Sequence, residues 1–416
     1  MKKILSCKLI ALVLILVMLA GLALSGCGMG AAAYSEQQNF ITIGVVCPLS
    51  GDLAPYGEGT LEMEEEALSE INEGEGLYID TLQRKLKVRF AVADSRSTSD
   101  GAKEAAKQLI EKEGAKLVIC SSGTKTALAA AEVCEENKVP FFSVGADPDQ
   151  WLAQGPFEYC FNCAASQGER IAALGDVWAE NGITSVGFMA MQSDSADVFG
   201  ETLAAYCNEN GISFTDSGRL DPAAPNYSGA VKTLAKAEVQ ALICYMNPAE
   251  FSLAWQTSDI KGLSLSMCIL ESAPFFAGEA AAISPGAEIQ GFFRAADWDR
   301  KYPFQSSLTD ETCSELAIRW EDQFLTPASE LLAYKHASAE VAVNALKLAM
   351  ALDAESICSA ARSLNVDTVL GTVDFDDKGI SIIPCSVQQW YFDVPTASWA
   401  KELYSHSRLK DVEFEE

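Results

Sequence analysis

The stretch ITIGVVCPLSGDLAPYG, residues 41–57, sets a pattern that much of this chain repeats. Its first eight residues form a nearly continuous apolar run, which is typical of a strand buried on both faces of a parallel sheet. The run ends at Pro48, and glycines 51 and 57 allow tight turns in the loop that follows. Tyr56 lies in this loop, in a position to overhang a cleft at the end of the strand.

Short apolar runs then alternate with stretches whose apolar residues recur at helical spacing. We expect strands at 85–93, 117–120 and 140–144 among helices at 61–72, 99–113 and 124–137. A second cycle has strands at 186–191, 241–246 and 265–270 among helices at 166–181, 194–210, 228–236 and 248–261. Past residue 289 the pattern turns helical, with helices at 310–324, 330–350 and 354–364 and a last strand-like stretch at 382–394.

The alternation predicts an α/β protein whose sheets are parallel and carry helices on both faces. A chain of 416 residues is too long for one compact core, so we expect two doubly wound lobes with a cleft between them. In such sheets, ligands bind just beyond the carboxyl ends of the strands. The residues that follow each strand are therefore the candidates for the site.

Hydroxyl residues follow the strand at 117–120. Ser121 and Ser122 lead through Gly123 into the helix that starts near Thr124. Free N–H groups at a helix start favour an anion, and hydroxyls add donors, so this loop is a candidate cradle for a carboxylate. The alternative is that Ser122 or Thr124 only caps the helix, which requires no ligand.

An acidic residue follows the last strand of the second cycle. Glu271 is expected to face the first lobe, and a carboxylate opposite an anion cradle suits a zwitterion such as an α-amino acid. The alternative is that Glu271 is a solvated strand end with no partner.

Three segments together resemble one family. Residues 41–57, the segment CSSGT at 120–124 and the segment DTVLGTVDFDDKG at 367–379 are similar, in this order, to the leucine/isoleucine/valine-binding proteins. That family consists of type I periplasmic binding proteins, which feed ABC transporters. The resemblance implies two lobes joined by three hinge strands, with residues 40–161 and 293–371 in lobe I and residues 162–292 and 372–416 in lobe II.

The resemblance also implies a set of ligand contacts. Ser121, Ser122 and the backbone near Ala146 would take the ligand carboxylate, Glu271 would pair with the ammonium, and Tyr56 would cover the ligand. The aromatic positions of the family fall on Phe199, Met246 and Trp298. Departures are the acid Asp147 in place of a hydroxyl residue, Met246 in place of an expected tyrosine, and Phe199, which lacks a phenol. The family also contains binders of amides, urea and aromatic acids.

The amino terminus predicts a location outside the cytoplasm. Lys2, Lys3 and Lys8 precede an uncharged apolar run that ends in LSGC, residues 24–27. This resembles a bacterial lipobox, so we expect residues 1–26 to be a signal peptide and Cys27 to carry lipid, followed by a tether to residue 39. The alternative is an uncleaved anchor, although 16 apolar residues are few for a membrane span.

Composition narrows the possible functions. A net charge of −28 disfavours nucleic acid and anionic lipid as partners. The cysteines lie mostly in apolar contexts, and the pair at 160 and 163 points to opposite faces of a strand, so we expect no metal and no cofactor. Because no catalytic motif is present and only two histidines occur, we expect a monomeric solute-binding protein that serves an ABC permease. A sensor module of the same fold is the alternative.

Overall fold

The computed structural model describes residues 39–272, 277–283, 291–393, 398–405 and 409. The predicted signal peptide, Cys27 and the tether up to residue 38 lie outside the described residues. Within the described part, no helix combines the length and the apolar character that a membrane crossing requires.

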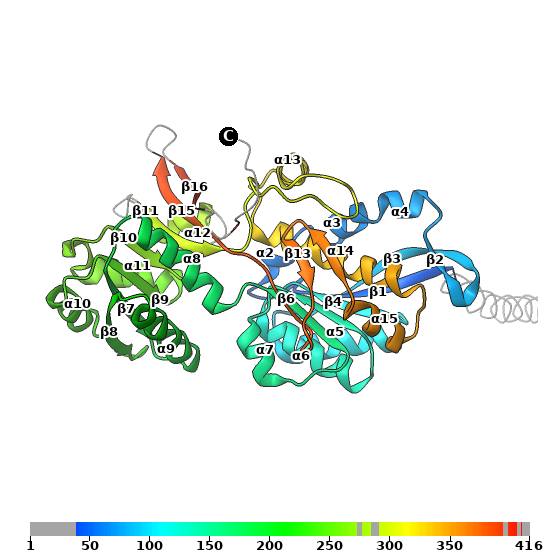
Figure 1. Ribbon diagram of the computed structural model, residues 1–416, viewed down its shortest axis with the longest axis horizontal. Helices are drawn as coiled ribbons and strands as arrows, with labels where there is room; N and C mark the ends of the chain where they lie inside the picture. Colours follow the sequence, from blue (N-terminus) through cyan, green and yellow to red (C-terminus); the bar gives the residue numbers. More distant parts are fainter. Residues whose placement is uncertain (1–38, 273–276, 284–290, 394–397, 406–408, 410–416) are drawn as a thin grey trace, which may run out of the picture.

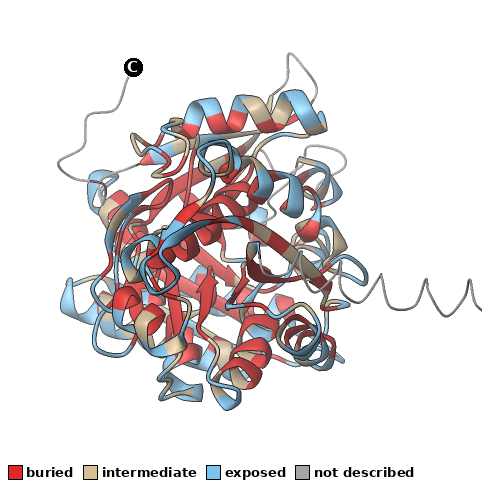
Figure 2. Cartoon of the chain, turned by 90° about the vertical axis from the view of Figure 1, so that its right-hand side faces the viewer, coloured by how far each residue is buried: buried red, intermediate tan, exposed pale blue. Residues whose placement is uncertain are grey.

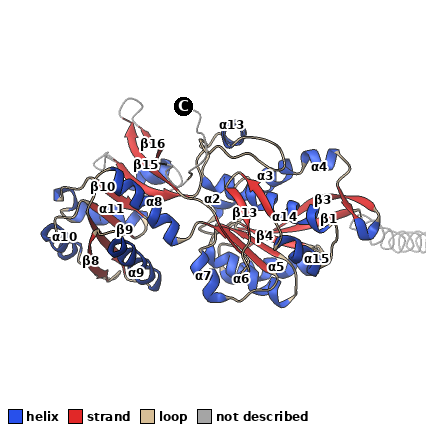
Figure 3. Cartoon of the chain, viewed as in Figure 1, coloured by secondary structure: helices blue, strands red, loops and turns tan. Residues whose placement is uncertain are grey.

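The chain forms two lobes, each built on a seven-stranded sheet (Figure 1, Figure 3). The first sheet has the order β14-β6-β5-β4-β1-β3-β2 and is parallel except for the β2–β3 pair. Its strands are β1 (Phe40–Cys47), β2 (Leu77–Ile79), β3 (Arg84–Asp94), β4 (Leu117–Cys120), β5 (Phe141–Val144), β6 (Cys160–Ala164) and β14 (Ile380–Ile382).

Helices cover both faces of this first sheet, as the apolar strands require (Figure 2). One face carries α5 (Ser99–Glu111), α6 (Thr124–Glu136) and α7 (Pro148–Gln154). The other carries α3 (Thr60–Ala67) and α14 (Glu330–Ala349). Shorter or peripheral elements of this lobe are α2 (Ala54–Gly57), α4 (Ser69–Glu73), α13 (Cys313–Phe324), α15 (Ala354–Ala361) and the hairpin of β12 (Asn365–Thr368) and β13 (Gly371–Asp374).

The second sheet has the order β16-β15-β11-β10-β9-β7-β8. Its strands are β7 (Ser185–Met191), β8 (Ser213–Leu220), β9 (Ala241–Tyr245), β10 (Met267–Leu270), β11 (Gly291–Ala296), β15 (Ser386–Asp393) and β16 (Ser398–Ser405). The helices α8 (Gln167–Glu180) and α9 (Asp194–Glu209) pack on one face. The helices α10 (Tyr227–Lys236), α11 (Pro248–Thr257) and α12 (Ala277–Ile283) pack on the other.

The chain passes between the two sheets three times: after β6, after β11 and between β14 and β15 (Figure 1). The predicted fold class, two α/β lobes of the type I periplasmic binding protein kind, is confirmed. The predicted lobe boundaries stay a proposal. Residues 162–164 and 380–382 pair in the first sheet, and residues 291–296 pair in the second, so the strands extend past the predicted boundaries.

Two predicted segments differ from the structure. The region past residue 289 opens with a strand, β11, before it becomes helical, because Phe292, Phe293 and their neighbours pair with β10 and β15. The stretch at 382–394 is not one strand, because Pro384 lies in the passage between β14 and β15. A proline removes a donor from the ladder, which suits a point where the chain leaves one sheet for the other.

Candidate ligand-binding site

The loop after β4 brings hydroxyls to the start of α6. Ser122 is buried, and its Oγ lies 3.3 Å from Cys120 Sγ and 3.4 Å from Thr126 Oγ1, so its side chain turns inward. Ser121 is partly exposed. The N-cap of α6 is Gly123, with φ +100, and no side chain caps the helix. The capping alternative for Ser122 and Thr124 is therefore not observed, and the first N–H groups of α6 are left for another acceptor.

The loop after β5 lies beside this helix start. The Asp147 N–H donates to Thr124 Oγ1 at 3.0 Å, which ties the two loops together. The Asp147 carboxylate accepts from the Gln150 N–H at 2.8 Å as the cap of α7. Its other oxygen accepts from Gln167 Nε2 at 3.1 Å, at the start of α8. Asp147 thus joins the first lobe to the first helix of the second, with both oxygens engaged.

Glu271 follows β10 and projects toward the same region. Its Oε2 is buried and has no hydrogen-bond partner among the described residues. Burial raises the pKa of the Glu271 carboxyl. The positive charges of Arg170 and Arg294 oppose this rise, whereas the negative charges of Asp297 and Asp147 increase it. The contribution of Asp147, which belongs to the opposite lobe, is the smallest of these. An unpaired buried carboxylate oxygen is costly unless a cation or donor meets it.

Tyr245, at the end of β9, interacts with the charges of Glu271 and Asp147 and is not among the residues predicted for the site. Burial, followed by the charges of Glu271 and Asp147, raises the pKa of its phenol to about 12. Its ring lies 5.0 Å from that of Phe199, which also stacks on Phe188 at 5.8 Å. Tyr245 therefore supplies the phenol that seemed to be absent.

Met246 lies elsewhere, in the apolar core that α10 and α11 share with the sheet. The side chains of consecutive strand residues point to opposite faces, so Tyr245 and Met246 pack on opposite sides of the sheet, and the ligand contact expected of Met246 stays a prediction. Because β9 is apolar along its whole length, its sequence shows no alternation that could have identified Tyr245.

A buried polar network joins the segments that pass between the lobes. Arg170 of α8 donates to Asp297 Oδ2 at 2.6 Å, and the Tyr334 hydroxyl donates to the same oxygen at 2.7 Å. The Asp297 N–H donates to Glu330 at 2.8 Å, and Arg294 forms a paired contact with the same carboxylate. The pair Arg170–Asp297 is separated by 127 residues, so no local sequence pattern could reveal it.

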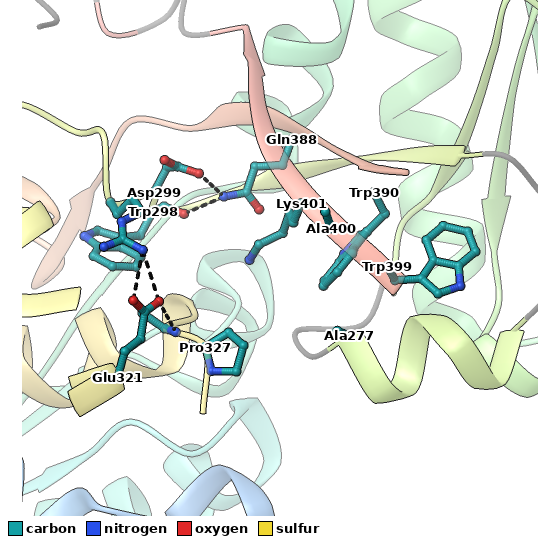
Figure 4. Close-up of a pocket in the computed structure, with 12 residues that line it drawn as sticks. Ala277, Trp298, Asp299, Glu321, Pro327, Gln388, Trp390, Trp399, Ala400 and Lys401 are labelled. Carbon is teal, nitrogen blue, oxygen red and sulfur yellow. Dashed lines mark hydrogen bonds and ion pairs between the residues drawn. The ribbon is translucent and has the colours of Figure 1, made fainter. Parts of the chain in front are cut away.

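Tyr56 and Trp298 lie at the edge of this region. Tyr56, in α2, is partly buried. Burial and the negative charge of Glu279 raise the pKa of its phenol. Because Glu279 belongs to α12 of the second lobe, Tyr56 faces that lobe. Trp298 is buried, and its indole N–H donates to Cys313 Sγ at 3.2 Å. It lines a cavity together with β15 and β16 rather than with Ser121 (Figure 4). Ala146 is buried, and its carbonyl accepts from Asn162 Nδ2 at 2.9 Å.

The sequence of residues 41–390 matches the family model described as periplasmic binding protein. The chain belongs to the periplasmic binding protein family. As a member, it is a solute-binding protein of the ABC-transporter type, and the family implies a place outside the cytoplasm and work alongside permease components.

Curated relatives and solved structures agree with this membership. The chain is 22% identical, over 85% of its length and 90% of the relative, to the Leu/Ile/Val-binding protein homolog 1 of Brucella abortus. Its fold is similar to that of the leucine binding protein LivK from Thermotoga maritima, with a TM-score of 0.66 and 18% identity over 88% of this chain and 99% of that one.

Two solved structures with bound ligands share the fold. LivJ from Streptococcus pneumoniae, in complex with isoleucine, has a TM-score of 0.66 at 16% identity, covering 88% of this chain and all of that one. A solute-binding protein from Rhodopseudomonas palustris, in complex with 3,4-dihydroxybenzoic acid, has a TM-score of 0.63 at 16% identity. The match covers 89% of this chain and 99% of that one. At these identities the likeness shows the fold and leaves the ligand open.

Proposed function

We propose that this protein binds an apolar α-amino acid of branched-chain size between its lobes and delivers it to an ABC permease. The observation that carries the proposal is the buried Oε2 of Glu271, which has no hydrogen-bond partner among the described residues and whose charge interacts with Asp147 of the opposite lobe. An α-ammonium group supplies the donor and the charge that this oxygen lacks. The uncapped start of α6, beside Ser121, receives the ligand carboxylate.

Apolar and aromatic groups complete the proposed pocket. Tyr245 contacts the ligand side chain from the second lobe, backed by the fully buried ring of Phe199, and Tyr56 covers it from the first. Because the ligand touches both lobes, its binding stabilises the closed form by the difference in its affinity for the two forms. A micromolar dissociation constant requires about −8 kcal/mol, within reach of two charged ends and one buried side chain.

A hydrolytic function is not favoured by the Ser–His pair of this chain. His336 Nε2 lies 2.7 Å from Ser306 Oγ, but both side chains are buried in the first lobe. Burial lowers the pKa of His336 to about 3, so the ring stays neutral at physiological pH. A nucleophile that no substrate reaches performs no catalysis. We therefore propose a binding protein that is not an enzyme.

The test of the ligand class is a set of thermal melts of the purified protein with single amino acids, 3,4-dihydroxybenzoate and urea. We expect leucine, isoleucine or valine to raise Tm by a few degrees, since ligand at 100 times Kd adds about 2.7 kcal/mol. If only dihydroxybenzoate or urea raised Tm, the ligand would belong to that class and not to the amino acids. If no compound raised Tm, the proposed amino-acid binding would be contradicted.

We further propose that Cys27 carries lipid and holds a monomer at the outer face of the membrane. The segment LSGC at 24–27 supports this assignment. Labelled palmitate should be incorporated into the wild-type protein but not into Cys27→Ser. Equal labelling of the two proteins would contradict the anchor.

A further inference from the structure

A cavity of about 250 Å³ lies apart from the proposed amino-acid site, and of the residues predicted for that site only Trp298 lines it. Its walls come from both lobes (Figure 4). The second lobe contributes residues of β15, β16 and α12, and the first contributes Glu321 of α13 with Pro327 and Ala328 beyond it. Helix α13 is fixed to the first lobe through Arg319, which pairs with Glu66 of α3.

Three indole side chains form the apolar part of the cavity. Trp298, Trp390 and Trp399 are each almost fully buried, and all three line it. Such flat, polarisable surfaces favour a planar aromatic guest, which stacks on them or meets them edge to face. The size also limits the guest, because pockets for drug-sized ligands measure about 300–1,000 Å³ and this cavity lies just below that range.

The charged groups of the cavity are paired, with one exception. Arg300 contacts both carboxylate oxygens of Glu321 at 3.1 Å. The Asp299 carboxylate accepts from Gln388 Nε2 at 2.8 Å and from the Lys301 N–H at 3.0 Å.

Lys401 is the exception. Its ammonium lies 5.6 Å from the centre of the Trp390 ring, but it makes no hydrogen bond or ion pair with any residue in the described part of the chain. Burial lowers the pKa of Lys401 to about 8, with Arg294 adding to the effect while Glu330 and Asp299 oppose it. The amine is therefore mostly protonated at neutral pH, and the carboxylates of Glu330 and Asp299 attract it without forming an ion pair with it in the described structure.

We propose that this cavity is a second binding site, which takes a small aromatic monocarboxylate. The ring contacts the indoles, and the carboxylate pairs with the Lys401 ammonium. A single negative charge fits better than two, because Asp299 and Glu321 line the same cavity and repel a dianion. Since the walls belong to both lobes, the bound acid also bridges them, and its occupancy is linked to the angle between the lobes.

The test uses benzoate as the probe, titrated into the purified protein by calorimetry and followed by quenching of tryptophan fluorescence. We expect benzoate to bind, and benzamide, which has the same shape without the charge, to bind at least tenfold more weakly. Lys401→Met should weaken benzoate binding at least tenfold. The matched control, Lys236→Met, removes one exposed lysine of the same lobe and should change the affinity less than twofold.

Two further results keep the proposal falsifiable. Lys401→Arg retains the charge and should retain benzoate binding within a few-fold, which separates loss of charge from loss of folding. Saturating leucine should not displace benzoate from the wild-type protein. Unchanged binding in Lys401→Met, or loss of benzoate binding in Glu271→Gln together with displacement by leucine, would overturn the second site.

Discussion

Two carboxylates from opposite lobes approach the proposed amino-acid site, and they differ in how they are satisfied. Both oxygens of Asp147 accept hydrogen bonds, from the Gln150 backbone and from Gln167. Glu271 has an oxygen with no partner in the described structure. The departure from the family pattern at Asp147 is thus explained by its role as the cap of α7 and as a link to α8. Glu271 is the acid left to meet a cation.

Replacing Glu271 by glutamine tests that assignment. The variant keeps the shape but removes the charge that pairs with the ligand ammonium, so leucine affinity measured by calorimetry should fall by roughly 1–3 kcal/mol. Glu201→Gln, the same change at an exposed position of α9, serves as the control and should bind like wild type. Equal affinity of the Glu271 variant and this control would exclude Glu271 from the site.

A pair of neighbouring substitutions tests the register at the end of β9. Tyr245→Phe removes the phenol beside Glu271 and should weaken ligand binding measurably, with little loss of stability. Met246→Leu conserves volume in the core and should cost less than about 1.5 kcal/mol in unfolding free energy while leaving affinity unchanged. The opposite outcome, with affinity sensitive to residue 246 and indifferent to residue 245, would restore the sequence-based assignment.

Glu340 of α14 provides a pH signature of the buried polar groups. It is fully buried, and burial raises its pKa from 4.5 to about 7, while hydrogen bonds from Ser307 and Val369 oppose the shift. The folded state therefore binds this proton more tightly than the unfolded state. The resulting stability is complete below the unfolded pKa and is lost as pH rises through about 7.

The Glu340→Gln variant isolates this contribution from all other titrating groups. The wild type loses stability as Glu340 ionises, and the variant does not. The unfolding free energy of the variant minus that of the wild type should therefore rise by roughly 3 kcal/mol from about pH 4.5 to pH 8, at 1.36 kcal/mol per unit of pKa shift. Urea unfolding of both proteins at the two pH values measures it. A stability difference that does not change with pH would contradict the raised pKa.

At the scale of elements, an ion pair links two of the segments that pass between the lobes. Arg170 of α8, which is partly exposed, and Asp297 beyond β11, which is fully buried, form an ion pair. Arg170→Met leaves the Asp297 charge without its partner and should cost about 3–5 kcal/mol in urea unfolding. Adding Asp297→Asn should recover part of that loss, because the uncompensated charge is gone. Strictly additive losses in the double variant would mean that the pair carries no coupling.

Elements with continuous apolar patterns were predictable from the sequence. The strands β1, β4, β5, β7, β9 and β10 and the long helices fall close to the expected ranges, because burial on both faces leaves an unbroken apolar run. The split of the predicted helix at 61–72 into α3 and α4 was not foreseen.

Polar or irregular strands were missed. The edge strand β8 is mostly polar, β11 contains the buried Arg294, and the hairpin of β12 and β13 has no apolar run. In the candidate site, the loop positions of Ser121, Asp147 and Glu271 follow from the strands. The buried partners of Arg170 and Arg294 depend on long-range packing, which no local pattern encodes.

At the scale of the whole molecule, three passages of the chain join the two lobes, and we propose that donors on one lobe and an acid on the other face a common ligand. The proposed second cavity touches both lobes as well, so a ligand at either place shifts the population of the same hinge angle. Family membership sets the general role, while the particular groups of this chain decide which solute it serves.

The most direct measurement is a crystal structure of the protein with the branched-chain amino acid that raises Tm most. We expect the ligand between the lobes, with its ammonium within hydrogen-bond distance of Glu271 Oε2 and its carboxylate at the start of α6 beside Ser121. A ligand bound away from both groups, or one whose ammonium faces the start of α6, would contradict it.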